Sequence, residues 1–372
     1  QRIEDEKLIK FRKWRLATVN YRRLGITETS RWLWTGLRKK IFEKILSPVT
    51  FHYGIAEHAQ GREFSELSRL TCRYPADIYI AHHPEALGAA YWASKKHQAY
   101  FAFDAEDFHT GELPENINPS RSARIEYLER KYLPYCDYIT AGSEGIADTL
   151  AQKYPIRHPE VILNVFPLEN LPRHNSMLKD RKGDSPSLYW YSQVIGPGRG
   201  LEEAVLAAGK LKKPCQMHLR GMLLDGFDER LKELASKSDS PVRLYFHPLA
   251  PPEQLIQLAA EHDIGLALEI DDRLNRLLCV TNKLFVYMLA RLSIVATDTP
   301  GQKSIMDQVP EAGIMCRIAD VKSLANAIEK LISDPVKLTN ARNASRQAAE
   351  NRFNWDIEKK KLIRIAERCL EK

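Results

Sequence analysis

The chain has 372 residues, of which 44% are hydrophobic and 28% charged, and its formal net charge is +7. This length allows about two domains with separate cores, and no apolar run approaches the ~18 residues needed to cross a bilayer. The charge suits anionic partners such as nucleotides, diphosphates or acidic lipids, and does not by itself indicate nucleic acid. Six dispersed cysteines without a C-x-x-C pair indicate neither a zinc site nor a disulfide framework, and fit a reducing cytoplasm.

An amphipathic basic helix is expected near the amino terminus, at residues 29–45. Either it packs against the first sheet, or it rests on an anionic membrane and meets a lipid-linked acceptor. Trp14, which lies among basic residues, belongs to the same question. Because the chain begins at Gln1 without a methionine, we expect an upstream piece to be missing. The helix mixes apolar with basic side chains, namely Trp32, Trp34, Leu37, Ile41 and Phe42 with Arg38, Lys39 and Lys40.

From residue 77 onward, short apolar strands alternate with helices, a pattern typical of stacked parallel βα units. In the first half, strands are expected at 77–82, 99–105, 138–143 and 161–167, and helices at 84–97, 119–135 and 145–154. A polar interval at 172–186 lacks apolar periodicity and is predicted to link the two halves. In the second half, strands are expected at 187–192, 215–220, 242–246, 264–268, 292–297 and 313–318, followed by amphipathic helices at 321–333, 336–353 and 354–372.

A glycine loop with one arginine, IGPGRG, follows the strand expected at 187–192. A single dinucleotide-binding domain usually has its glycine loop after its first strand, so this mid-chain position indicates a second nucleotide-binding half. Gly196, Gly198 and Gly200 allow the backbone to approach phosphates, and amides at a helix N-terminus bind anions. Arg199 can offer a bidentate fork to such an anion. The alternative is a tight turn with a surface arginine.

Lys283 is the second candidate cation, at the start of a helix expected at 283–289. A lysine in the first turn of a helix is unfavourable unless an anion lies nearby, which favours a ligand at this position. Asn282 is expected to cap this helix. The alternative is a solvated lysine.

Together these features resemble the GT-B glycosyltransferases, in particular the family-4 group of retaining, nucleotide-sugar-dependent enzymes. The resemblance covers the chain from about Asp77 to its end and rests on four segments: DIYIAHHPEALGAA, IGPGRGLEEA, TNKLFVYMLARLSIVATDTPG and RFNWDIEKK. It implies an α/β fold with two Rossmann-like domains facing a cleft. The implied parts are an acceptor domain at 1–171, the linker at 172–186, a nucleotide-sugar domain at 187–353, and a helix at 354–372 that packs back on the first domain.

Two carboxylates of the family pattern are missing. Val286 stands where many members have the glutamate that holds the donor ribose, and Leu278 lies eight residues before it. We expect Glu269, at the carboxyl end of the strand at 264–268, to take over this contact, with Asp271 and Asp272 behind it. The alternative is a solvated acidic loop. The resemblance also implies that the diphosphate is held by Arg199, Lys283 and the amides of Gly198–Gly200, with His247 and Pro248 near the base.

The acceptor side is expected in the first half. His82, with His83 beside it, is the closest match to the family histidine that lines the donor sugar, and imidazole suits that role near neutral pH. Glu106, Asp107 and His109 follow the next strand, after Asp104, and could orient or activate an acceptor hydroxyl. The alternatives are buried strand-end histidines and a capped or solvated turn. The resemblance implies transfer on one face of the sugar, with the departing phosphate helping to deprotonate the acceptor, so that no metal is required. The lack of a D-x-D motif in a strand-end loop is consistent with this, and no cofactor besides the nucleotide sugar is expected.

The sequence therefore predicts a glycosyltransferase that moves a sugar from a nucleotide-diphospho sugar to a saccharide or lipid-linked acceptor, with retention, in cell-envelope polysaccharide or glycoconjugate synthesis. It would be cytoplasmic, either free or peripheral on the inner face of the plasma membrane through 29–45. The alternative is a catalytically degenerate GT-B subunit that serves as a binding or assembly module of a larger synthase. A Rossmann dehydrogenase ranks third, because no acidic residue follows a G-x-G-x-x-G motif at the required distance of about 20 residues.

Overall fold

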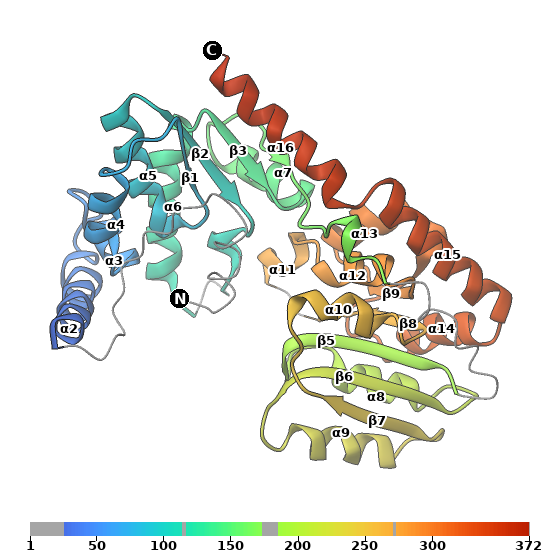
Figure 1. Ribbon diagram of the computed structural model, residues 1–372. Helices are drawn as coiled ribbons and strands as arrows, with labels where there is room; N and C mark the ends of the chain where they lie inside the picture. Colours follow the sequence, from blue (N-terminus) through green and yellow to red (C-terminus); the bar gives the residue numbers. More distant parts are fainter. Residues whose placement is uncertain (1–25, 114–116, 173–184, 271–272, 372) are drawn as a thin grey trace. The chain divides into compact units, whose positions relative to one another are not determined.

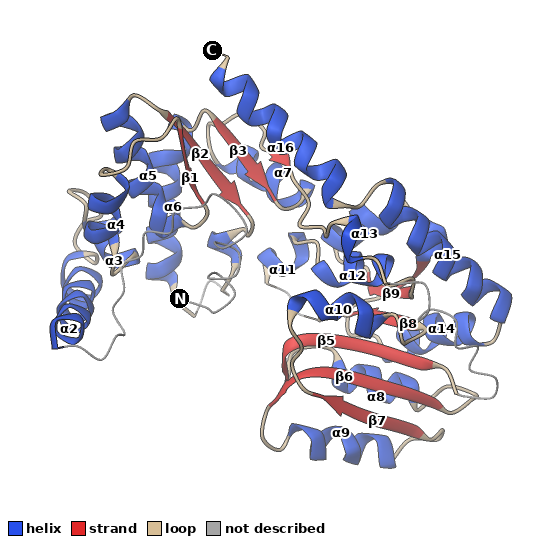
Figure 2. Cartoon of the chain, viewed as in Figure 1, coloured by secondary structure: helices blue, strands red, loops and turns tan. Residues whose placement is uncertain are grey.

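The computed structural model describes residues 26–113, 117–172, 185–270 and 273–371, with side chains from residue 29. They form two compact units, each with its own parallel sheet and covering helices (Figure 2). Within the described ranges, the first unit comprises the residues up to Ala141, Ala147–Glu160 and those from Glu367 onward, and the second comprises Gly142–Ile146 and the residues between Val161 and Ala366. No helix among the described residues is long and apolar enough to cross a membrane.

The sheet of the first unit has the order β1-β2-β3-β4. Its middle strand β2, YFAFDA, is almost entirely buried, as a run of apolar residues covered on both faces should be. Ile78 lies opposite Tyr100 and Ala102 opposite Tyr138 in parallel register, so the carboxyl ends of β1 and β2 meet at one edge. The strands are β1 (Ile78–Ala81), β2 (Tyr100–Ala105), β3 (Tyr138–Ala141) and β4 (Glu160–Val161).

Prolines and polar caps mark where the helices of this unit begin. Pro84 opens α5 after the extended residue His83, and the Asn118 side chain accepts a hydrogen bond from the Arg121 amide at the start of α6. The helical segments are α2 (Ile26–Ile41), η1 (Phe42–Leu46), α3 (Ile55–Gln60), α4 (Phe64–Thr71), α5 (Pro84–His97), η2 (His109–Gly111), α6 (Pro119–Tyr132), η3 (Leu133–Tyr135) and α7 (Glu144–Lys153).

The second unit contains a six-stranded sheet of order β10-β9-β8-β5-β6-β7 (Figure 1). Successive residues of β5 enter opposite layers of the core: Leu188 and Trp190 pack in one hydrophobic cluster and Tyr189 in the other. The first cluster includes residues of α8 (Leu201–Ala208) and α14 (Val321–Ile332), and the second includes residues of α12 (Asn282–Leu289). The strands are β5 (Ser187–Ile195), β6 (Cys215–Leu223), β7 (Val242–His247), β8 (Ile264–Ala267), β9 (Ser293–Thr297) and β10 (Gly313–Cys316).

Aspartates cap the two helices that follow the last strand: Asp320 caps α14 and Asp334 caps α15 through side-chain bonds to backbone amides. The helical segments of this part of the chain are η4 (Leu168–Asn170), α8 (Leu201–Ala208), α9 (Phe227–Ser236), α10 (Pro252–Ala259), α11 (Leu274–Leu278), α12 (Asn282–Leu289), α13 (Pro300–Met306), η6 (Pro310–Ala312), α14 (Val321–Ile332), α15 (Pro335–Asn351) and α16 (Trp355–Leu370).

One expected strand is almost absent. Of residues 161–167, only Val161 lies in a strand, as the end of the two-residue β4. Leu163 and Val165 are still buried, but in the core of the second unit, and the Leu163 amide donates to the Glu358 carboxylate of α16 at 3.0 Å. The alternating apolar residues of this segment are therefore buried against helices. The Glu358 side chain, rather than a neighbouring strand, accepts the hydrogen bond of the Leu163 amide.

Candidate functional site

The glycine loop between β5 and α8 has the left-handed backbone that its glycines permit. The φ angles of Gly198 and Gly200 are 70° and 74°. A Cβ atom at Gly200 would lie 2.9 Å from Cβ of Leu268, whereas nothing lies within 4 Å of one at Gly198. Gly200 thus allows close approach of the segment that follows β8, and Gly198 leaves the loop open. Arg199 lies between them, half-buried, with its guanidinium 3.4 Å from the Ser192 hydroxyl.

Two further cations converge on the segment that follows β8. Glu269 lies just beyond that strand, with Oε1 3.6 Å from Nζ of Lys283 on α12 and Oε2 3.3 Å from a guanidinium nitrogen of Arg276 on α11. The Glu269 amide donates to the Thr297 hydroxyl at 2.9 Å, which fixes the loop at the end of β9. Lys283 also lies over the Trp190 ring at 5.7 Å. We call Arg199, Glu269, Arg276 and Lys283 the cation cluster.

The members of the cation cluster act electrostatically on one another. Burial lowers the pKa of Lys283; the Glu269 carboxylate opposes this, and Arg199 and Arg276 add to the lowering. Burial also lowers the pKa of Arg199, and Arg276 again contributes. Like charges held this close in a partly desolvated position favour binding of an anion that offsets their repulsion. The arrangement can hold a phosphate or diphosphate beside the amides of the glycine loop.

The start of α12 differs from the expectation. Thr281, not Asn282, is the N-cap residue, it makes no side-chain capping bond, and Asn282 is the exposed first residue of the helix. The prediction that Asn282 caps this helix is therefore wrong, and Lys283 lies one position further in. The first turn of α12 has no acidic residue that would compete with an incoming anion.

The positions of the missing carboxylates have other roles in this chain. Val286 is fully buried in the hydrophobic cluster around α12, where an ionised carboxylate would be costly. The Leu278 carbonyl accepts a hydrogen bond from the Ser143 hydroxyl at 2.7 Å. The expected supporting acids Asp271 and Asp272 lie outside the described residues.

His247, expected near the base, ends β7 and belongs to a stack of aromatic side chains. Its Nε2 lies 3.0 Å from Nδ1 of His218, and the two rings stack at 5.3 Å. Burial, followed by the charge of Arg220, lowers the pKa of His247. Arg220 in turn donates to the carbonyl of Pro248 at 3.0 Å. Within the described part of the chain, the contacts of His247 therefore join it to His218 rather than to the cation cluster.

In the first unit, the predicted acceptor-side residues gather at the ends of β1 and β2. His82 Nδ1 lies 3.0 Å from Oδ2 of Asp104, and Oδ1 of Asp104 accepts a hydrogen bond from the Thr140 hydroxyl at 2.6 Å. The bond to Asp104 is the main cause of a raised pKa of His82, which favours the charged imidazolium. His82, Asp104 and Glu106 each offer one ligand atom within 4.8 Å of the others, a spacing that could hold a divalent cation.

His109 is buried next to these residues, and its ring lies 5.5 Å from that of His83. Its Nδ1 lies 2.5 Å from Oε1 of Glu112, and Arg121 binds the other oxygen of that carboxylate at 2.8 Å. Burial is the largest single influence and lowers the pKa of His109, but the bond to Glu112 and the charges of Glu112, Glu129 and Asp107 together outweigh it, and the pKa is raised. The Nε2 atom of His109 is buried without a hydrogen-bond partner among the described residues. Asp107 is partly buried, and its charge contributes to the raised pKa of His109.

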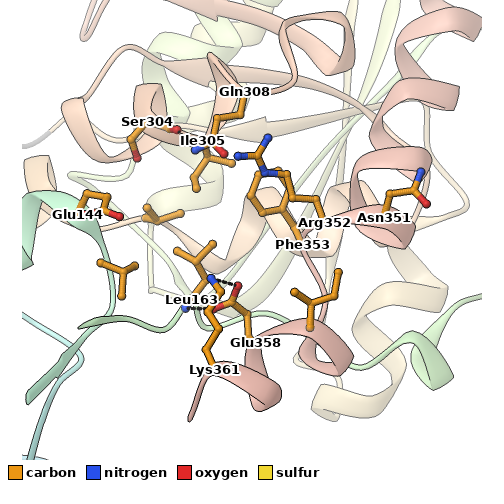
Figure 3. Close-up of a pocket in the computed structure, with 13 residues that line it drawn as sticks. Glu144, Leu163, Ser304, Ile305, Gln308, Asn351, Arg352, Phe353, Glu358 and Lys361 are labelled. Carbon is orange, nitrogen blue, oxygen red and sulfur yellow. Dashed lines mark hydrogen bonds and ion pairs between the residues drawn. The ribbon is translucent and has the colours of Figure 1, made fainter. Parts of the chain in front are cut away.

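A pocket of about 510 Å³ lies elsewhere in the second unit, between α13, α16 and the segment around Leu163 (Figure 3). The Glu358 carboxylate in its wall is bonded to the Leu163 amide and lies 2.6 Å from Nζ of Lys361. None of its lining residues is a predicted site residue. The pocket is therefore distinct from the cation cluster.

Arg276 is the member of the cation cluster that the sequence did not predict. It lies on the five-residue helix α11, whose sequence LNRLL has no glycine or motif that marks it. The sequence feature that could have indicated Arg276 is its position between Glu269 and Lys283, on the connection that leads from β8 to α12. A search for further cations near the carboxyl end of a strand would have included it.

No family model and no curated protein matches this sequence. Solved structures do match the fold. HepE from Anabaena, in complex with UDP and glucose, is 16% identical with a TM-score of 0.68, covering 86% of this chain and 84% of that one. Sucrose-phosphate synthase from Thermosynechococcus elongatus is 14% identical with a TM-score of 0.68, covering 90% and 80%. A glycosyltransferase from Rickettsia africae is 16% identical with a TM-score of 0.64, covering 83% and 80%. The predicted GT-B fold, α/β with two parallel sheets, is thereby confirmed.

Proposed function

We propose that this chain is a glycosyltransferase that binds a nucleotide-diphospho sugar through its second unit. The observation that carries this proposal is the cation cluster, in which Arg276 and Lys283 converge on one carboxylate beside a glycine loop that contains Arg199. The HepE structures of the same fold, solved with UDP, with UDP and glucose, and with UDP-glucose, support it. The acceptor would be a saccharide or a lipid-linked molecule in cell-envelope polysaccharide or glycoconjugate synthesis. The enzyme would act in the cytoplasm, and residues 29–45 would bring it to a membrane-bound acceptor.

The proposed transfer proceeds with retention and without a metal. The bond between the sugar C1 and the diphosphate oxygen breaks, the acceptor oxygen bonds to C1 on the same face, and the acceptor proton passes to the departing phosphate. Arg199, Lys283 and the amides of Gly198–Gly200 would stabilise the charge that develops on the leaving diphosphate. His82 would line the donor sugar, Glu106, Asp107 and His109 would orient the acceptor hydroxyl, and His247 would lie near the base.

Glu269 would serve two states of the site. Without donor, its carboxylate is the counterion of Arg276 and Lys283. A bound diphosphate would take over these two cations, and the carboxylate would then be available to accept a hydrogen bond from a ribose or sugar hydroxyl. In this way Glu269 would replace the acid that is absent at Val286.

The test is nucleotide binding by the full chain, measured by calorimetry with UDP, GDP, CMP and ADP. We expect one nucleoside diphosphate to bind, and Arg199→Ala, Lys283→Ala and Arg276→Ala each to weaken it about 10- to 100-fold, because each removes a charge-assisted contact of roughly 1.5–3 kcal/mol. Arg230→Ala on α9 is the matched control, since that arginine is half exposed and pairs only loosely with Glu202 and Glu233. A folded protein that binds none of the four nucleotides would refute the proposal.

A second candidate function is a degenerate GT-B subunit that binds or assembles within a larger synthase. The buried valine at position 286, in place of an acid, is the observation that favours it. The two functions differ in turnover: an enzyme hydrolyses or transfers from the sugar nucleotide that it binds, whereas a degenerate subunit binds it without release of free nucleotide.

A further inference from the structure

The outer face of α2 and the following turn is apolar and exposed, which is the reverse of an ordinary surface helix. Leu33, Leu37 and Ile41 recur at every fourth position, and the row continues through η1 to Ile45 and Val49. Leu33 is 58% exposed, Ile45 62% and Val49 82%. We call this row, with Trp34 beside it, the apolar stripe: Leu33, Trp34, Leu37, Ile41, Ile45 and Val49.

Polar side chains attach the opposite face of α2 to the first unit. The Arg38 guanidinium donates to both oxygens of Glu66, at 2.6 and 3.2 Å, and to the carbonyl of Arg62 at 2.8 Å. The Phe42 ring of η1 lies 4.6 Å from the His58 ring of α3, with the two rings tilted by 33°. These contacts fix the rotation of the helix about its axis, so that the apolar stripe points away from the unit that carries it.

The sequence pattern placed Arg38 and Phe42 among the candidate membrane-binding residues, whereas both face inward. Trp32 also has a partner, since the Arg62 guanidinium lies over its ring at 5.2 Å. Arg31, Lys40 and Lys44 are exposed cations of this segment, and Lys40 and Lys44 each directly precede a residue of the apolar stripe. The chain that precedes α2 adds charge of the same sign, because residues 1–25 contain eight basic and three acidic side chains.

We propose that the apolar stripe docks on the surface of an anionic lipid bilayer. Its leucine, isoleucine and tryptophan side chains enter the boundary between headgroups and acyl chains, while Lys40 and Lys44 bind lipid phosphates. A second copy of the chain fits the same face less well. A two-fold interface brings the same surface of both copies together, so it would enclose the lysines of both copies without an acidic residue of the apolar stripe to pair with them. Docking is separate from nucleotide binding, and it rests on the proposed function, in which residues 29–45 bring the enzyme to a membrane-bound acceptor.

The test is co-sedimentation of the full chain with phosphatidylcholine vesicles, with and without phosphatidylglycerol. We expect binding to the anionic vesicles, and a loss of at least about tenfold in Leu37→Glu/Ile41→Glu, because two inserted side chains become charged. Lys40→Gln and Lys44→Gln should each weaken binding roughly fivefold, and this part should disappear at high salt. Val336→Glu on α15, which is 68% exposed, is the matched control and should bind as the original chain does.

The proposal is overturned if the original chain binds neither kind of vesicle, or if Leu37→Glu/Ile41→Glu binds as well as the control. Sedimentation velocity without lipid tests the alternative that the apolar stripe binds a second copy of the chain. A dimer that dissociates in Leu37→Glu would support that alternative and overturn the proposal. UDP binding is measured on the same variants, so a failure of the donor-site proposal is recognised separately.

Discussion

At the scale of single residues, Glu269 organises the donor site that we propose. Its two oxygens face Lys283 and Arg276, and its charge opposes the lowering of the Lys283 pKa by burial and by neighbouring cations. An anionic ligand would make the same favourable interactions with the same cations. The site therefore already has the charge arrangement that a diphosphate requires, with a side chain as its counterion.

Glu112 gives a residue-scale prediction with a defined pH dependence. Burial raises its pKa, but the bonds to His109 and Arg121 outweigh this and lower the pKa from 4.5 to about 2. A carboxyl group with a lowered pKa stabilises the fold above its unfolded pKa, and this contribution is lost as the pH falls from about 4.5 towards 2. Glu112→Gln should lower the free energy of unfolding by about 2 kcal/mol at pH 7 and by about 1 kcal/mol less at pH 4, measured by urea unfolding.

The control for this prediction is Glu253→Gln, which replaces an exposed glutamate at the start of α10. It should change the free energy of unfolding by less than about 0.5 kcal/mol at either pH. An equal loss for Glu112→Gln at pH 7 and pH 4 would show that the bonds of Glu112 do not depend on its charge, which would contradict the prediction.

The sequence indicated some of these residues and not others for physical reasons. Arg199 and Lys283 stand next to a glycine loop and at the start of a helix, where local geometry alone favours an anion. Arg276 has no such local mark, and its role comes from the chain path that brings α11 beside Glu269. The choice of Asn282 over Thr281 as the cap failed because helix boundaries shift by a residue or two with little cost.

At the scale of elements, the turn from β5 to α8 depends on the difference between its two left-handed glycines. Gly200→Ala should destabilise the protein by about 2–4 kcal/mol. Its Cβ needs an unfavourable φ of 74° and meets Leu268 at 2.9 Å, so backbone strain and overpacking both contribute. The same variant should weaken nucleoside diphosphate binding, because the displaced loop carries Arg199. Urea unfolding and calorimetry measure the two effects.

Gly198→Ala is the matched control, because its φ of 70° is equally unfavourable while its Cβ would enter open space. It should cost only about 1–2 kcal/mol. If both variants lose the same stability, the close approach of Leu268 is not the reason that position 200 requires glycine, which would contradict the prediction.

Elements with strong local signals were predictable, and an element defined by distant contacts was not. The expected helix at 84–97 coincides with α5 because proline and an extended residue start it, and an αL residue, Gln98, ends it. The segment 161–167 has the alternation of a strand, but the Leu163 amide binds Glu358, which is 195 residues away in the sequence. Nothing in the local pattern distinguishes a strand that is buried within a sheet from an extended segment that is buried against helices.

At the scale of the whole molecule, the alternation of strands and helices was sufficient to predict two Rossmann-like halves, since each half repeats the same βα unit. The exact division could not be obtained in this way. Residues 142–146 group with the second unit although they follow β3 of the first, and the predicted linker lies almost entirely outside the described residues. Such groupings depend on tertiary contacts, so the predicted domain boundaries stay a prediction.

The charge of a donor diphosphate can be neutralised by cationic side chains or by a metal ion. In this molecule the candidate side chains and the candidate metal ligands belong to different units. The cations Arg199, Arg276 and Lys283 belong to the second unit, whereas the group that could hold a divalent cation, His82, Asp104 and Glu106, belongs to the first. Asp104 already accepts a bond from Thr140 and lies 3.0 Å from His82, so both of its carboxylate oxygens have partners within the first unit. We therefore expect the side chains to carry the diphosphate.

Removal of metal by EDTA should then leave both the affinity for the nucleoside diphosphate and the rate of sugar transfer within about twofold of their values without chelator. Added salt should weaken nucleotide binding, because it screens the side-chain cations that remain partly accessible. Calorimetry and a transfer assay on the same EDTA-treated sample measure the two quantities. A transfer rate that EDTA abolishes and Mg²⁺ or Mn²⁺ restores would contradict the expectation. In that case Asp104→Asn distinguishes a metal bound in the first unit, which this variant would lose, from one that arrives with the diphosphate.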